Sequence, residues 1–206
     1  MTPIKKHTGI AIPLVRDNID TDTIIPSREM RSVSKAGLSE GLFAPWRYQD
    51  RDLRSPNLDF PMNQPAYSGA TIFLGGRNFG CGSSREQAVW ALQEWGCKAV
   101  IAHSFGTIFR NNATRNGLLT IALDSATIDM LSNWVTSDPQ ANRLDIDLIQ
   151  CQINIANKMV RFEIAADTRT MLLEGLDEIG LTEKLLDEVD AFEKRDRRNR
   201  PWIYLS

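Results

Sequence analysis

Short apolar runs alternate along residues 70–123 with longer segments in which apolar residues recur at helical spacing. The short runs are typical of buried strands and the longer segments of amphipathic helices. The pattern predicts strands at 70–74, 99–102 and 118–123 and helices at 84–95 and 105–116. Gly96 and Gly117 follow the two helices and are expected to end them. Apolar strands that alternate with helices build a parallel sheet covered by helices, so we expect an α/β fold with a mainly parallel central sheet.

The sequence on both sides of this region predicts further elements. Residues 10–15 form an apolar run typical of a strand, and residues 37–65 are rich in Gly, Pro, Asn and Asp, as in a long irregular connection. Farther along, the pattern predicts a helix at 127–135, a half-buried strand at 144–148, a hairpin at 153–164 and helices at 169–178 and 182–193. We expect one domain over residues 1–206, with a C-terminal helical extension over about 167–206.

The turn between the strand at 70–74 and the next helix is rich in glycine. Gly75, Gly76, Gly80 and Gly82 lie within eight positions. Glycine lets the backbone turn tightly and leaves no side chain to block a ligand. Ligands of parallel sheets bind beyond the carboxyl ends of the strands, which is where this turn falls. The turn is therefore the first candidate for a binding site.

Polar residues at the end of this turn favour a small carboxylate as the ligand. Ser83 with Glu86, and Ser84 with Gln87, match the S-x-x-E/Q capping box, so we expect one of the serines to cap the helix. The amides of a helix N-terminus attract anions, and Arg85 adds a two-pronged donor that suits a planar carboxylate. The alternative is a well-capped helix without a ligand. Two hydroxyls and a guanidinium at one helix terminus favour a binding site.

Known nucleotide loops match this turn poorly. Residues 80–85 begin like the dinucleotide fingerprint G-x-G-x-x-G, but Arg85 replaces the third glycine. The turn also lacks the Gly-Lys-Ser/Thr ending of a P-loop and the G-x-S-x-G elbow of α/β hydrolases. A nucleotide is therefore a poorer candidate than a small carboxylate.

Two other groups of residues have the types found in functional sites. Asp20 and Asp22 resemble the start of a calcium loop, but Ile24 stands where the next oxygen ligand belongs, so carboxylates that cap a turn are favoured over a metal site. His103 belongs to a chain with only two histidines and no elbow serine, which argues against a Ser-His-Asp hydrolase. We interpret His103 as a structural or supporting residue.

Composition and cysteine usage narrow the possibilities further. The chain is 42% hydrophobic and 24% charged with a net charge of −2, so nothing points to a nucleic-acid partner. It has no run of roughly 20 apolar residues and no hydrophobic signal core at its start, and we expect a cytoplasmic protein. Cys81, Cys97 and Cys151 share no C-x-x-C spacing, so we expect no metal site here, and any iron–sulfur cluster must come from another chain.

Two motifs resemble those of a known family. Residues 78–86, Asn-Phe-Gly-Cys-Gly-Ser-Ser-Arg-Glu, resemble the signature of the swivelling domain of the aconitase superfamily. Residues 18–26, Asn-Ile-Asp-Thr-Asp-Thr-Ile-Ile-Pro, resemble the N-terminal motif of the same family. With the chain length and residues 175–182, the resemblance is to the small subunits of 3-isopropylmalate dehydratases and covers essentially the whole chain. The chain departs from the family at Gln87, where histidine is usual.

The resemblance implies a fold, a reaction and a partner. The fold would be a swivelling β/β/α domain, and the reaction would interconvert 2-isopropylmalate and 3-isopropylmalate through 2-isopropylmaleate in leucine biosynthesis. A large subunit would hold a 4Fe-4S cluster whose open iron binds the departing hydroxyl. The two chains would form a heterodimer or heterotetramer.

The resemblance also assigns roles to residues of this chain. Ser83 would be the catalytic base, acting as an alkoxide that Arg85 and nearby amides stabilise in a site closed to solvent. The residues implied in substrate binding are Ser84, Arg85 and Arg28, with Asp22 and Gly82 in supporting roles. Arg28 begins the segment 28–35, which also contains Arg31 and Lys35 and would carry substrate-recognition contacts.

Two other functions remain open. Glu29, Met30 and Gln87 depart from the commoner family residues, so a related hydro-lyase acting on citraconate or 2-methylmalate-type dicarboxylates is one alternative. A non-catalytic module that binds a carboxylate at the capped helix is the other. Turnover measured with and without a large subunit separates the second alternative from an enzyme.

The cysteine spacing generates a first prediction. Purified anaerobically by itself, the chain should contain no stoichiometric iron or sulfide and have no dehydratase activity, because its cysteines lack cluster spacing. Metal and acid-labile sulfide analysis of the single chain tests this expectation. A full complement of iron and sulfide in the single chain would contradict it.

Overall fold

A four-stranded parallel sheet forms the centre of the computed structural model, which describes residues 1–30, 36–50, 52–156 and 158–204. The strand order is β2-β5-β6-β7, with each neighbouring pair parallel. The strands are β2 (Ala11–Leu14), β5 (Ile72–Gly75), β6 (Ala99–Ala102) and β7 (Leu119–Ala122). The parallel α/β fold and the three strands predicted within 70–123 are confirmed.

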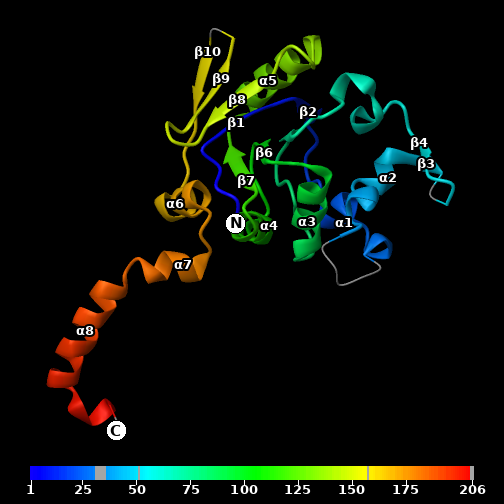
Figure 1. Cartoon of the computed structure of the whole chain (residues 1–206). Coiled ribbons are helices and arrows are strands. Elements are labelled where there is room, and N and C mark those ends of the chain that lie inside the picture. Colours follow the sequence, from blue (N-terminus) through cyan, green and yellow to red (C-terminus); the bar gives the residue numbers. More distant parts are fainter. Residues whose placement is uncertain (31–35, 51, 157, 205–206) are drawn as a thin grey trace.

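Helices cover this sheet on both faces (Figure 1). They are α3 (Glu86–Trp95), α4 (Thr107–Asn116) and α5 (Ser125–Ser137). Phe73 of β5 packs in the same buried cluster as residues of α3 and α4, whereas its neighbours Ile72 and Leu74 pack with α5. This alternation is what a strand buried on both faces requires. Gly96 and Gly117 end α3 and α4 in the left-handed conformation, as predicted.

A second, antiparallel sheet in the order β1-β8-β9-β10 packs on the α5 side of the first. Its strands are β1 (Lys6–Gly9), β8 (Leu144–Asp147), β9 (Gln152–Ile155) and β10 (Lys158–Arg161). The predicted hairpin and half-buried strand are confirmed. The prediction of one strand at 10–15 is incomplete, because the chain changes sheets at Ile10 between β1 and β2. The residues of β1, Lys-His-Thr-Gly, contain no apolar run that could have predicted this strand.

The segment between β2 and β5 contains only short elements. They are α1 (Thr21–Ile24), η1 (Ser27–Glu29), η2 (Ser39–Gly41), α2 (Ala44–Arg47), β3 (Tyr48–Asp50), β4 (Ser55–Pro56), η3 (Pro61–Asn63) and η4 (Pro65–Tyr67). Aromatic packing orders this region, since the Phe43 ring lies 5.9 Å from Trp46, 6.1 Å from Phe60 and 5.7 Å from Phe73, measured between centroids. The predicted irregular connection therefore packs against the sheet.

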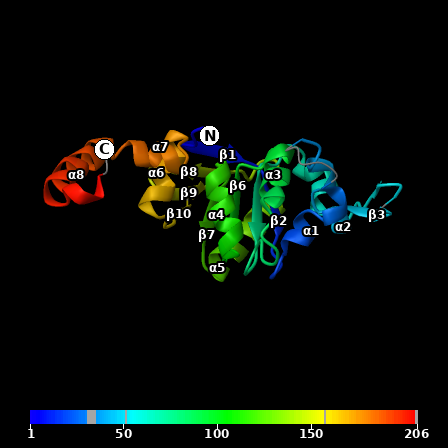
Figure 2. The ribbon, with the colours of Figure 1, turned by 90° about the horizontal axis from the view of Figure 1, so that it is seen from below.

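Three helices and a final turn form the C-terminal region, where two helices were predicted. They are α6 (Ala166–Glu174), α7 (Glu178–Glu183), α8 (Leu186–Asn199) and η5 (Pro201–Ile203). The predicted helix at 169–178 begins after the true start of α6 and runs past its end, because Gly175, at φ +73°, ends α6 and Asp177 caps α7. Helix α8 projects from the rest of the chain, and Figure 2 places it and β3 at opposite ends. The single domain over 1–206 stays a prediction. Within the described ranges, no helix is both long and apolar enough to cross a membrane.

Gly80 provides a test of the tight packing beneath the glycine-rich turn. A Cβ at Gly80 would lie 2.2 Å from Cγ of the buried Phe109, and its φ is +73°. Gly80→Ala should lower the free energy of unfolding by about 2–5 kcal/mol, because left-handed backbone costs about 1–2 and overpacking about 1–3 kcal/mol. Gly69→Ala is the matched control, since Gly69 has a similar φ of +75° and no atom within 4 Å of the added Cβ. Equal losses for both variants in urea denaturation would contradict the expectation.

Candidate active site

The N-terminal motif and the glycine-rich turn lie side by side, joined through their backbones. The Gly80 N–H donates to the Ile19 carbonyl at 2.7 Å, and the Thr21 N–H donates to the Cys81 carbonyl at 2.9 Å. Asp20 and Cys81 pair as an isolated parallel bridge. The Asp20 carboxylate also caps α1 by accepting a hydrogen bond from the Thr23 N–H at 2.6 Å. Helix α1 is thereby fixed against the turn that leads into α3.

This arrangement brings together Asp22 and Arg85, two of the predicted site residues. Arg85 Nη1 donates to the Asp22 carboxylate and, at 3.4 Å, to the Ile25 carbonyl. The Arg85 side chain is 21% exposed. Within the described residues its Nε and Nη2 atoms have no acceptor, so one edge of the guanidinium is open. That edge matches the two oxygens of a carboxylate.

The predicted serine cap of α3 is wrong. The helix begins at Glu86, so Arg85 is the N-cap residue, and it makes no side-chain capping bond. The Ser83 carbonyl accepts from the Thr21 hydroxyl at 2.8 Å and from the Arg85 N–H at 2.8 Å. These two bonds bend the backbone into a tight turn at Ser84. The helix therefore begins after both serines, at Glu86.

Both serines are consequently available to a ligand. Ser83 and Ser84 are exposed, and neither hydroxyl forms a hydrogen bond with any residue that the structure describes. Gly82 precedes them at φ +87°, a left-handed conformation that glycine adopts at little cost. Burial, and then the nearby Asp20 carboxylate, raise the pKa of the neighbouring Cys81 thiol. A raised pKa lowers the fraction of Cys81 that is thiolate at neutral pH.

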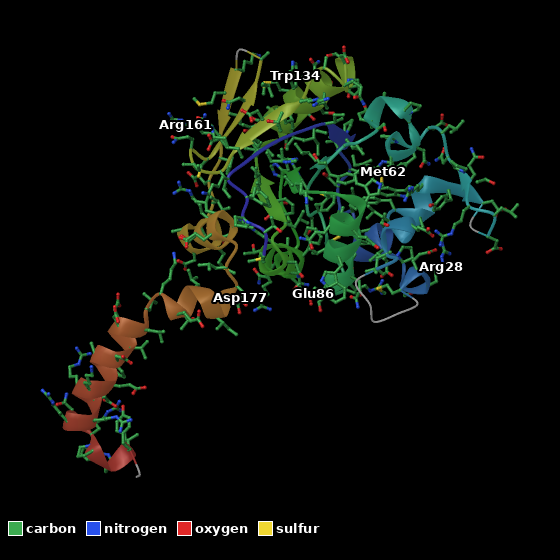
Figure 3. The ribbon with its side chains drawn as sticks, viewed as in Figure 1. Arg28, Met62, Glu86, Trp134, Arg161 and Asp177 are labelled. Carbon is green, nitrogen blue, oxygen red and sulfur yellow. The ribbon has the colours of Figure 1, made fainter. Side chains whose placement is uncertain are left out.

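Arg28 does not join this group. It lies on η1, and its guanidinium contacts the neighbouring Glu29 carboxylate at 3.4 Å, which is its one ion pair within the described ranges. Glu29 in turn binds Arg54 at 2.7 Å. Figure 3 labels Arg28 at the edge of the molecule and Glu86 at the start of α3. Arg31 and Lys35 lie outside the described residues.

His103 is placed away from the serines. Its Nδ1 lies 3.2 Å from the Ser125 hydroxyl at the start of α5. Both residues, with Asp17 and Arg77, line a cavity of about 360 Å³ at the carboxyl edge of the parallel sheet. No described contact links His103 to Ser83, and its interpretation as a structural or supporting residue stays a prediction.

The candidate site is an open surface. The structure contains cavities of about 440, 240 and 360 Å³ within its described part, and none of these three is lined by Ser83, Ser84 or Arg85. A hydroxyl on an open surface is solvated by water and has its ordinary acidity. The site therefore needs a further surface to close it before strong-base chemistry becomes possible.

Thr21 is a residue of the site that the sequence analysis missed. It is only 2% exposed, and it binds the turn through both its N–H and its hydroxyl. Its place between Asp20 and Asp22 in the N-terminal motif was a signal that could have identified it. A buried polar residue inside a motif with a site carboxylate is a candidate for holding that site in shape.

The fold and this turn define a class of protein, an α/β domain with an open, polar, glycine-rich turn at the carboxyl edge of its parallel sheet. Residues 1–126 match the family described as the aconitase C-terminal domain. The chain is 29% identical, with a TM-score of 0.64, to a crystal structure described as 3-isopropylmalate dehydratase from Methanocaldococcus jannaschii, over 92% of this chain and 99% of that one.

Curated relatives give a closer match. A 3-isopropylmalate dehydratase small subunit from Cupriavidus necator is 52% identical over 99% of both chains. A small subunit of the same name from Acidothermus cellulolyticus is 46% identical over 95% of this chain and 94% of its own. The chain belongs to the family of 3-isopropylmalate dehydratase small subunits.

The geometry of Arg85 generates the next prediction. Arg85→Lys keeps the charge but cannot make two parallel hydrogen bonds to a ligand carboxylate while it holds Asp22, because an ammonium lacks the planar fork. In a complex reconstituted with the large subunit, we expect a raised KM and a lowered kcat, with kcat/KM falling about 10–100-fold. Arg77→Lys is the control, since Arg77 is exposed on the same turn and lines a different cavity. Wild-type kinetics for Arg85→Lys would place Arg85 outside the site.

Proposed function

We propose that this chain is the catalytic small subunit of an enzyme that interconverts 2-isopropylmalate and 3-isopropylmalate through 2-isopropylmaleate, a step of leucine biosynthesis. The observation that carries the proposal is the 52% identity over 99% of both chains with a protein named 3-isopropylmalate dehydratase small subunit. The names of the other relatives favour the same substrate over citraconate or 2-methylmalate-type acids.

A large subunit with a 4Fe-4S cluster completes the enzyme in this proposal. The residues of this chain do not fit such a cluster, because its described part holds no group of three His, Cys, Asp or Glu side chains that could bind a metal ion. Burial also raises the pKa of the Cys97 thiol well above its usual range, which disfavours the thiolate that a cluster needs. The word "small subunit" in the relatives' names supports a second chain. We infer a heterodimer or heterotetramer in the cytoplasm.

Ser83 is the base in the proposed mechanism. The proton leaves a carbon beside a carboxylate and moves to Ser83 Oγ, while the electron pair forms the carbon–carbon double bond and the hydroxyl departs on the side of the large subunit. Adding water back in the other orientation gives the isomer. The serine must act as an alkoxide, which requires a dry site and a nearby positive charge. Arg85 supplies that charge two residues away.

Arg85 and Asp22 divide the task of binding the substrate. The Asp22 carboxylate and the Ile25 carbonyl hold Nη1, so the guanidinium keeps one orientation. The open edge formed by Nε and Nη2 receives a substrate carboxylate, and the Ser84 hydroxyl adds a hydrogen bond. Arg28 is proposed as a further carboxylate contact, because its exposed 3.4 Å pair with Glu29 is weak enough for a ligand to replace.

Reconstitution tests the proposal directly. The purified chain is mixed with the large subunit carrying its cluster, and interconversion of the two isopropylmalates is followed for the complex and for each chain alone. We expect activity only in the complex. A complex that binds dicarboxylates without converting them would support a non-catalytic binding module, and faster conversion of citraconate would indicate the related hydro-lyase.

The base assignment generates a prediction for Ser83→Ala. In the reconstituted complex kcat should fall about 10²–10⁴-fold, the usual contribution of a general base. The Arg85 contacts remain, so KM should change much less. Because neither serine caps α3, the unfolding midpoint of the chain should be close to that of the wild type.

Ser84→Ala is the control for this substitution. It removes the same atoms one residue along the same exposed turn and should be milder in kcat. Near-normal kcat for Ser83→Ala, with the cluster of the partner intact, would show that the base is a water or a residue of the large subunit.

A further inference from the structure

Thr21 makes two hydrogen bonds to the turn that carries the serines. Its hydroxyl donates to the Ser83 carbonyl at 2.8 Å and its N–H donates to the Cys81 carbonyl at 2.9 Å. The two carbonyls lie on either side of Gly82, whose left-handed backbone would otherwise be free to turn. Because Thr21 is only 2% exposed, water cannot readily replace its hydroxyl. Thr21 and the Arg85 N–H, which donates to the same carbonyl at 2.8 Å, together set the direction of the Ser83 carbonyl, and Thr21 is the only one of the two that reaches it from another segment of the chain.

The direction of this carbonyl determines where the next N–H points. The described part of the chain contains no cis peptide bond, and in a trans peptide the C=O and N–H groups point in opposite directions. The Ser83 carbonyl points towards Thr21, so the Ser84 N–H points away from α1. Ser84 is exposed, and no described residue accepts a hydrogen bond from its N–H. The turn thus presents a backbone donor beside the Ser83 hydroxyl.

We propose that Thr21 is a positioning residue that holds the Ser84 N–H as a hydrogen-bond donor to the substrate carboxylate next to the reacting carbon. This inference rests on the proposed function. As Ser83 removes the proton, negative charge grows on that carboxylate. A donor that is already oriented stabilises this charge without reorganising. Thr21 acts through the Ser83–Ser84 peptide, because its hydroxyl binds the backbone carbonyl of Ser83 and not the reactive hydroxyl.

Thr21→Val tests the proposal because it keeps the shape of the side chain and removes its hydroxyl. In the reconstituted complex, kcat for 2-isopropylmalate should fall about 10–100-fold, while KM stays within about threefold. This fall is at most as large as the fall in kcat that follows removal of a complete oxyanion-hole donor. Thr21→Ser restores the hydroxyl and should recover most of kcat. Thr23→Val is the matched control on the same short helix, since the Thr23 hydroxyl has no hydrogen bond to the described residues.

A second variant keeps the test valid if Thr21→Val fails to fold. An amide-to-ester substitution at residue 84 replaces the proposed donor N–H with oxygen and leaves Thr21 in place. The same fall in kcat is expected, and the two changes combined should lower kcat little more than either alone, because both remove one donor.

The outcomes separate this inference from the proposed function. If the ester variant or a folded Thr21→Val variant keeps the wild-type kcat, the inference is wrong. The proposed function still holds in that case, provided that the wild-type complex converts isopropylmalate. A fall in kcat that merely follows the folded fraction, measured by circular dichroism, assigns Thr21 a purely structural role and also overturns it. A wild-type complex without isopropylmalate turnover overturns both.

Discussion

The close approach of three backbone segments is the constraint on which the rest of this structure depends. A Cβ at Gly80 would collide with Phe109, and a Cβ at Gly106 would lie 2.6 Å from the Gly80 carbonyl oxygen. Because neither glycine has a side chain, the glycine-rich turn packs directly on α4 and on the loop before it, while the backbone bonds from Gly80 to Ile19 and from Thr21 to Cys81 join the turn to the N-terminal motif. Only at this distance can Thr21 and Asp22 reach the turn that carries the serines.

Different interactions hold the fold and shape the site. The rings of Phe79 and Phe109, 5.5 Å apart between centroids, are buried beneath the turn, and burying such side chains contributes about 1.5–3 kcal/mol each. The Asp22–Arg85 ion pair is partly exposed, and pairs of this kind contribute about 0–1 kcal/mol. Its main effect is therefore orientation, because it fixes one arm of the guanidinium and leaves the other edge open. Stability comes from the aromatic core and ligand geometry from the ion pair.

An open site is compatible with a two-chain enzyme. Ser83 is exposed, so water solvates its hydroxyl in this chain and the alkoxide is inaccessible. A second chain that covers the turn would exclude water and strengthen the attraction of Arg85 for negative charge. The reactive state of the serine would then exist only after assembly, which keeps a strong base from forming in the isolated chain.

The sequence by itself determined the alternating strands and helices and the glycine helix ends, because hydrophobic periodicity and glycine are local signals. Through the resemblance of their motifs it also predicted that Asp22 and Arg85 lie together, and the structure joins them in an ion pair. Tertiary structure decided the rest. Helix α3 begins at Glu86, after both serines predicted to cap it, because the Ser83 carbonyl binds Thr21. Strand β1 has no apolar run of its own and forms through pairing with β8. Both depend on contacts between residues far apart in the chain, which no local pattern encodes.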